Sequence, residues 1–150
     1  MTLPAYIQTS TPEETEAVGR TVAQALAADP TLPSFVALYG DLGVGKTAFT
    51  RGFVSHLCPA ARVKSPTFAL VHEYRGGGRT VFHFDMYRVE SEDELESIGF
   101  YDYLDRPGFC LVEWSENIPY ALPEAYLRVE IEKDDPNAPD HRSIRVDLIS

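Results

Sequence analysis

Several features are scarce or missing in this sequence, and each absence narrows the class of protein. No run of about eighteen apolar residues occurs, so we expect no transmembrane helix and no membrane contact. The opening MTLPAYIQTS has neither a basic start nor an apolar stretch, which argues against a secretory signal peptide. There are only two cysteines, Cys58 and Cys110, and both lie in apolar surroundings. We expect buried free thiols in a reducing compartment, rather than a disulfide or a metal site, and hence a cytoplasmic protein.

Basic residues are also scarce. The chain has 13 Lys and Arg against 23 Asp and Glu, which gives a net charge of −10. A protein that grips nucleic acid by its phosphates usually has a basic face, so strong independent binding to nucleic acid is not expected. Six basic residues nevertheless fall in one central stretch, where they form a local basic patch or neutralise acidic neighbours or a bound anion: Arg51, Arg62, Lys64, Arg75, Arg79 and Arg88.

The length of 150 residues predicts one domain, residues 1–150, with room for a real core. Two helix starts carry capping boxes: Thr11 with Glu14, which opens a helix over about 12–28, and Ser91 with Glu94, which opens a short helix to about Ile98. Gly99 suits the end of the second helix.

Apolar and alternating runs predict the strands. SFVALYG and FCLVE are buried strands, and TFALVHEY and TVFHFDMY form a hairpin around RGGGR. YLRVEIEK and SIRVDLIS alternate and predict an antiparallel pair near a sheet edge. Together these elements predict an α/β sandwich in which helices lie on both faces of a mixed sheet that ends in antiparallel C-terminal strands.

The segment GDLGVGKT, residues 40–47, fits the phosphate-binding pattern G-x-x-x-x-G-K-[ST] in full. A buried strand precedes it and a helical apolar rhythm follows it, as a P-loop requires. Glycines let successive N–H groups turn toward one anion, and the helix N-terminus adds its positive dipole end. Lys46 is expected at the β- and γ-phosphates and Thr47 at Mg²⁺. The predicted nucleotide contacts are Asp41, Leu42, Gly43, Val44, Gly45, Lys46, Thr47 and Ala48.

Two carboxylates follow predicted strands. Glu113 ends FCLVE, where it is a candidate metal ligand of the Walker B kind or a Glu at an exposed strand terminus. Asp85 ends VFHFD, where it could position or activate a water, hold Mg²⁺ through water, or form a cap or an ion pair with Arg88. Thr67 in KSPTF senses a γ-phosphate or forms a plain turn.

Three other residues are expected to be structural. His72 and His83 lie on predicted strands without a partner at metal spacing, and Trp114 is expected to pack near the site. No N-K-x-D stretch indicates guanine specificity. The sequence shows no obvious lid and no acceptor pocket, so nothing in it argues for a small-molecule kinase.

Four blocks, GDLGVGKTAFTRGF, VKSPTFALVHEY, HFDMYR and LVEWSE, resemble the TsaE (YjeE) family of bacterial P-loop ATPases over about residues 11–116. The resemblance implies ATP or ADP with Mg²⁺, Lys46 on the phosphates, Thr47 and Glu113 on the metal, and Asp85 near the γ-phosphate. It also implies that the protein acts with TsaD and TsaB in tRNA threonylcarbamoyladenosine synthesis and contacts tRNA only indirectly, through that complex.

The resemblance also implies that the start of the first helix, around Thr11 to Thr15, and Arg142 approach the adenine, although DHRSIRV departs from the family pattern. We expect a slow, partner-stimulated ATPase. The alternatives are a small-molecule kinase and a nucleotide-gated binding module that needs no hydrolysis.

Overall fold

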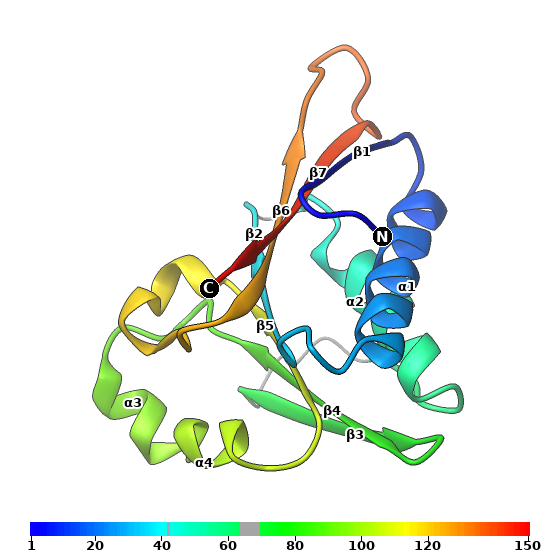
Figure 1. Cartoon of the computed structure of the whole chain (residues 1–150). Coiled ribbons are helices and arrows are strands. Elements are labelled where there is room, and N and C mark those ends of the chain that lie inside the picture. The colour runs from blue at the N-terminus through cyan, green and yellow to red at the C-terminus, as the bar shows by residue number, and fades with distance from the viewer. Residues whose placement is uncertain (42, 64–69) are drawn as a thin grey trace.

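The structure is a computed structural model that describes residues 1–41, 43–63 and 70–150. Its centre is a seven-stranded sheet in the order β1-β7-β6-β2-β5-β4-β3 (Figure 1). The strands are β1 Ala5–Thr9, β2 Phe35–Tyr39, β3 Val71–Gly76, β4 Arg79–Asp85, β5 Phe109–Glu113, β6 Tyr126–Lys133 and β7 Arg142–Ile149. The helices are α1 Pro12–Ala28, α2 Lys46–Leu57, α3 Glu92–Ser97 and α4 Phe100–Leu104, with 3-10 turns at Ser115–Asn117 and Pro119–Ala121.

Four strands at the centre of the sheet, β6, β2, β5 and β4, run parallel to one another. Antiparallel pairings flank them, β6 with β7 and β7 with β1 on one side, and β4 with β3 on the other. The predicted mixed sheet with antiparallel C-terminal strands is therefore confirmed. The parallel arrangement brings the carboxyl ends of β2, β5 and β4 to one edge, where ligands bind in open α/β sheets.

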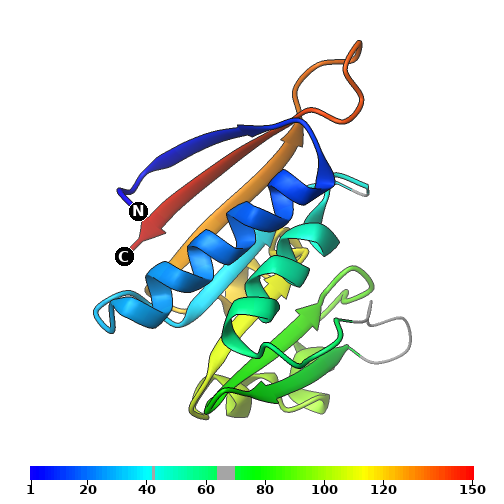
Figure 2. The same cartoon turned by 90° about the vertical axis from the view of Figure 1, so that its right-hand side faces the viewer.

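Helices cover both faces of the sheet, as the sequence predicted. Helices α1 and α2 lie side by side on one face, and α3 and α4 lie on the other (Figures 1 and 2). Successive residues of β2 point into the two cores in turn: Val36 and Leu38 pack below α1 and α2, and Phe35 and Ala37 pack on the opposite side. This double burial explains why SFVALYG reads as a continuous apolar run.

Local signals set the start of α1 as predicted. The Thr11 hydroxyl accepts a hydrogen bond from the Glu14 N–H at 3.1 Å, and the Glu14 carboxylate accepts one from the Ser10 N–H at 3.0 Å. Ser91 caps α3 in the same way through the Glu94 N–H at 3.4 Å. Both helices therefore begin where the capping pattern placed them.

Two glycines allow α1 and α2 to touch backbone to backbone. A Cβ added at Gly19 would lie 2.0 Å from the Phe49 carbonyl oxygen, and one added at Gly52 would lie 1.8 Å from the Glu16 carbonyl oxygen. This reciprocal contact fixes where α2, and with it the loop that precedes α2, sits on the sheet. The sequence analysis did not identify this contact, because each glycine looks unremarkable within its own helix.

Two elements were not predicted. Strand β1 is a five-residue strand that pairs with β7, and so covers the edge that the C-terminal pair would otherwise form. Helix α4 is a single turn that starts directly after Gly99, whose φ of 74° ends α3 as expected. Strand β1 and helix α4 both form through contacts with residues far away in the chain. Where TFALVHEY predicted a strand, the described strand begins at Val71, and residues 67–69 lie outside the described part.

Both cysteines are buried and unpaired, as predicted. Within the described residues, no helix is both long enough and apolar enough to cross a membrane.

Candidate functional site

The site is built around residues 40–47, here called the glycine loop, which connects β2 to α2. Gly43 and Gly45 have φ angles of 74° and 111°, which side-chain-bearing residues rarely adopt, so the loop needs glycine there. Within the described residues no side chain caps α2, in contrast to α1 and α3. The first N–H groups of α2 therefore remain available to an anion. Leu42, a predicted contact, lies outside the described residues.

Lys46 opens α2 and is only 6% exposed. Its ammonium donates to the Gly40 carbonyl oxygen at 2.5 Å and lies 3.5 Å from the ring centroid of Trp114. Burial lowers the Lys46 pKa, and the carboxylates of Glu113, Glu116, Asp85 and Asp41 oppose that shift. Trp114 was predicted to pack near the site, and the structure shows that its ring packs over the ammonium group of Lys46.

Two predicted carboxylates meet beside this lysine. Asp85 and Glu113 are register partners at the carboxyl ends of the parallel strands β4 and β5. Glu113 is 7% exposed, so the alternative of an exposed strand terminus is wrong. Asp85 is half-buried, and burial raises its pKa above the ordinary 3.8. Its Oδ1 accepts the Tyr87 N–H at 3.0 Å, which is the predicted cap bond rather than an ion pair with Arg88.

Glu113 also contacts a histidine for which no site role was predicted. His83 Nε2 and Glu113 Oε2 form a buried hydrogen bond between neighbouring strands. Thirty residues separate the two positions in the chain, and only the parallel pairing of β4 with β5 brings them together. The expectation that His83 is purely structural therefore missed its contact with the site.

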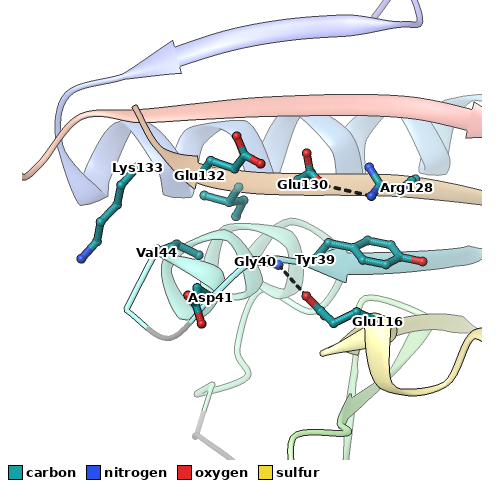
Figure 3. A pocket seen from close by; sticks show the side chains of 10 residues that line it. Tyr39, Gly40, Asp41, Val44, Glu116, Arg128, Glu130, Glu132 and Lys133 are labelled. Carbon is teal, nitrogen blue, oxygen red and sulfur yellow. Dashed lines mark hydrogen bonds and ion pairs between the residues drawn. The ribbon is translucent and has the colours of Figure 1, made fainter. Parts of the chain in front are cut away.

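Glu116 is a second residue of the site that the sequence analysis missed. Its carboxylate accepts the Gly40 N–H at 3.3 Å, which ties the 3-10 turn after β5 to the start of the glycine loop (Figure 3). The LVEWSE block contains Glu116, but nothing in its spacing indicates this bond.

A hollow of about 670 Å³ opens beside the glycine loop, between the ends of β2 and β6 (Figure 3). Four carboxylates and two cations line it: Asp41, Glu116, Glu130, Glu132, Arg128 and Lys133. Arg128 is already engaged by the Glu130 carboxylate at 2.9 Å and the Tyr39 ring at 4.2 Å. Carboxylates outnumber cations in the lining of this hollow, which disfavours an unaccompanied anion there.

A second hollow, of about 50 Å³, brings together Thr11, Thr15 and Arg142, which were predicted to approach adenine, and Ala48, a predicted nucleotide contact. It has room for one or two water molecules, so a base could rest against it but not be enclosed. The Thr15 hydroxyl is shared with Thr9 at 2.8 Å.

Arg142 is occupied by backbone carbonyls. Its Nε donates to the Val44 oxygen at 2.7 Å and its Nη2 to the Gly43 oxygen at 3.3 Å, while Nη1 donates to Pro139 and His141. Arg142 therefore braces the glycine loop in this structure. Its predicted contact with adenine stays a prediction.

Two of the predicted site residues could supply oxygen donors to a divalent cation. Thr47 is exposed in the first turn of α2, and Glu113 stands at the end of β5. Within the described residues, no cluster of three or more His, Cys, Asp or Glu could hold a metal alone. Such a sparse oxygen set suits Mg²⁺, which keeps waters and takes substrate phosphates as ligands. Thr67 lies outside the described residues.

Parts of the central basic stretch neutralise acidic neighbours. Arg51 lies 3.8 Å from Glu16, and Arg75 lies 2.6 Å from Glu73. These pairs favour charge neutralisation over a nucleic-acid patch. Lys64 lies outside the described residues.

The chain is similar in sequence to proteins of one known family. Residues 9–144 match the family model described as threonylcarbamoyl adenosine biosynthesis protein TsaE. The tRNA threonylcarbamoyladenosine biosynthesis protein TsaE of Bacillus subtilis is 41% identical over 127 residues, which are 84% of this chain and 76% of that protein. Its namesake in Haemophilus influenzae is 46% identical over 97 residues, which are 65% of this chain and 61% of that protein, so the match spans less than two thirds of that relative.

A solved structure shows the same fold. The crystal structure of Bacillus subtilis YdiB aligns with a TM-score of 0.74 at 32% identity and covers 99% of this chain and 87% of that one. The family match covers most of the chain, and it includes the glycine loop and the strand ends that carry Asp85 and Glu113. This chain therefore belongs to the TsaE family of threonylcarbamoyl adenosine biosynthesis proteins.

Proposed function

We propose that this protein is a Mg²⁺-dependent ATPase that serves tRNA threonylcarbamoyladenosine synthesis together with TsaD and TsaB. One observation carries the proposal: Lys46, Asp85 and Glu113 converge at the uncapped N-terminus of α2 in a member of the TsaE family. This combination supports a site that binds a polyphosphate and presents carboxylates to it.

The charges at the site support a requirement for a divalent cation. Glu113, Glu116, Asp85 and Asp41 all act on the Lys46 ammonium, so the local charge is negative before any nucleotide arrives. A polyphosphate would therefore bind more weakly without a cation than with one. Thr47 and Glu113 would hold Mg²⁺, which offsets phosphate charge when it is bound.

The protein side chains would divide the remaining work. Lys46 would leave the Gly40 carbonyl and donate to phosphate oxygens, an exchange favoured by its burial and lack of hydration. Asp85 would accept a hydrogen bond from the attacking water, with one oxygen held by the Tyr87 N–H and the other directed by that bond. A raised pKa brings this carboxyl group closer to the range in which a general base works.

Slow turnover in isolation follows from the small site. Half-exposed Tyr87 packs against Trp114 with the ring centroids 4.9 Å apart and the rings tilted by 45°, and Trp114 lies over the Lys46 ammonium, but Thr47 and Gly43 stay open to solvent. Water is therefore not excluded from the site, and a docking partner could complete its enclosure.

The test is ATP hydrolysis by the purified protein, alone and with the TsaD–TsaB pair. A low rate that rises with the pair is the expected result. A rate indifferent to the pair would contradict the partner-stimulated role, and transfer of phosphate to a metabolite instead of water would identify a kinase. Restoration of tRNA modification by a variant that binds but does not hydrolyse ATP would favour the nucleotide-gated module.

A further inference from the structure

His83 is a buried polar side chain in a position where an apolar residue would be expected. It is 1% exposed on β4 and points to the α1–α2 side of the sheet, as Val81 does two residues earlier. Burial of an imidazole is unfavourable unless its nitrogens find partners. One nitrogen bonds to Glu113, whereas Nδ1 has no hydrogen-bond partner among the described residues.

The hydrogen bond between His83 and Glu113 needs one of the two groups to donate. A carboxylate that binds a metal is ionised and can only accept hydrogen bonds, so a metal-binding Glu113 requires the proton on Nε2 of His83, which then donates to Glu113 Oε2. That bond occupies one carboxylate oxygen and sets the plane of the carboxyl group. Among the described residues no hydrogen bond of the other oxygen, Oε1, is found, so this oxygen is the one that a ligand would meet.

We propose that His83 is a positioning residue that holds the Glu113 carboxylate in the orientation in which it receives Mg²⁺. The inference rests on the proposed function, because it assigns His83 a role through a carboxylate that would bind the metal. Hydrogen-bond partners of metal ligands commonly change metal affinity by about 10- to 100-fold. Loss of the His83 donor would also leave Glu113 buried beside an apolar group, which favours other orientations of the carboxylate.

Three substitutions separate this role from simple packing. His83→Phe keeps a ring but removes the donor, and His83→Gln keeps a donor near the position of Nε2. His72→Phe is the control, because His72 is the cross-strand partner of His83 in β3, a strand that does not pair with the strand of Glu113. Thermal unfolding first establishes which variants fold.

The measurement is ADP binding followed by Trp114 fluorescence, first in EDTA and then during a MgCl₂ titration. We expect His83→Phe to raise the Mg²⁺ midpoint at least tenfold while metal-free ADP affinity changes less than about twofold. His83→Gln should stay within about threefold of the wild type in its Mg²⁺ midpoint, and His72→Phe should match the wild type. An unchanged Mg²⁺ midpoint in folded His83→Phe would overturn the proposal. An equal loss of metal-free affinity would also overturn it, since that pattern indicates general distortion.

A second measurement uses the wild-type protein and does not depend on any variant folding. Nitrogen-15 spectra of the histidine rings should show the His83 proton on Nε2, with a signal that moves when Mg²⁺ is added to the ADP-bound protein. An unprotonated Nε2 would overturn the positioning role while leaving the ATPase proposal intact. Failure of the wild type to bind ADP or ATP in any buffer would instead refute the proposed function, and the inference would fall with it.

Discussion

Replacement of Arg142 by alanine should weaken nucleotide binding by about 30-fold. The Arg142 guanidinium donates to two carbonyl oxygens of the glycine loop, those of Gly43 and Val44. Each such bond contributes about 1 kcal/mol net, so their loss costs the ordered loop about 2 kcal/mol. At 1.4 kcal/mol per factor of ten, that free energy corresponds to the stated loss of affinity.

The assay is calorimetric titration of the folded protein with Mg²⁺·ADP. Arg145→Ala is the matched control, because Arg145 lies on the same strand but pairs with Asp147 at 2.6 Å on the surface. Arg142→Lys keeps the positive charge without the planar fork and should recover only part of the affinity.

A second ligand distinguishes bracing from direct contact with the base. If Arg142 acts by ordering the loop, inorganic triphosphate with Mg²⁺ should lose affinity by the same factor as the nucleotide. A loss confined to nucleotides would support the predicted adenine contact. Wild-type affinity of Arg142→Ala for both ligands would refute the reasoning.

The other predictions concern the site and the helix pair below it. Lys46→Ala should lower ATP affinity by about 10- to 100-fold through loss of a charged donor, and normal ATP hydrolysis by this variant would contradict the site assignment. Glu113→Ala should raise the Mg²⁺ concentration needed for half-maximal ATP hydrolysis at least about tenfold, and an unchanged metal titration would count against its role. Asp85→Asn should bind ATP but hydrolyse it poorly. Burial raises the Asp85 pKa above 3.8, so the wild-type rate of ATP hydrolysis should decrease with falling pH in a range that lies above pH 3.8. The pH–rate profile of Asp85→Asn should lack this decrease, which checks the assignment. Gly52→Ala should lower the free energy of unfolding by about 3 kcal/mol or more, because its Cβ would meet a backbone oxygen at 1.8 Å. The control Gly78→Ala, with a φ of 77° and open space, should cost about 1 kcal/mol in the same denaturant titration.

The Asp85 carboxyl also makes a signed prediction for stability. Its pKa is higher in the folded protein than the ordinary 3.8, so the folded state binds the proton more tightly than the unfolded chain does. The stability that protonated Asp85 contributes is therefore lost, and the free energy of unfolding decreases, as pH rises from 3.8 through the raised pKa of Asp85 in the folded protein. The Asp85→Asn variant should lack this component, which makes the difference between the two proteins in denaturant titrations a check on the burial of Asp85.

Elements with local causes were predicted closely. Helix α1 begins as expected because the Thr11 hydroxyl accepts the Glu14 N–H and Pro12, at the first helical position, has no N–H to satisfy. The glycine loop was predicted because it needs a contiguous pattern, and its glycines do adopt positive φ angles. Buried strands were predicted because both of their faces are covered, which leaves continuous apolar runs.

Elements with distant causes were missed. Strand β1 depends on hydrogen bonds to β7, about 140 residues away in the chain, and its five residues carry too little pattern to stand out. The Gly19–Gly52 contact joins two helices, so neither helix shows it alone. Where Arg142 was expected to approach a base, only the structure shows that its donors reach the carbonyls of Gly43 and Val44.

The sequence by itself determined the chemistry available at the site: a lysine after a glycine loop, a hydroxyl beside it, and carboxylates at two strand ends. Tertiary structure alone decided how these groups meet. Parallel pairing of β4 with β5 sets Asp85 opposite Glu113 and delivers His83 to the Glu113 carboxylate. The physical reason is that hydrogen bonding between strands and close packing between helices act over a few ångströms in space, whatever the separation along the chain. A local pattern records the first few neighbours of a residue, but the bonds that orient this site come from residues tens of positions away.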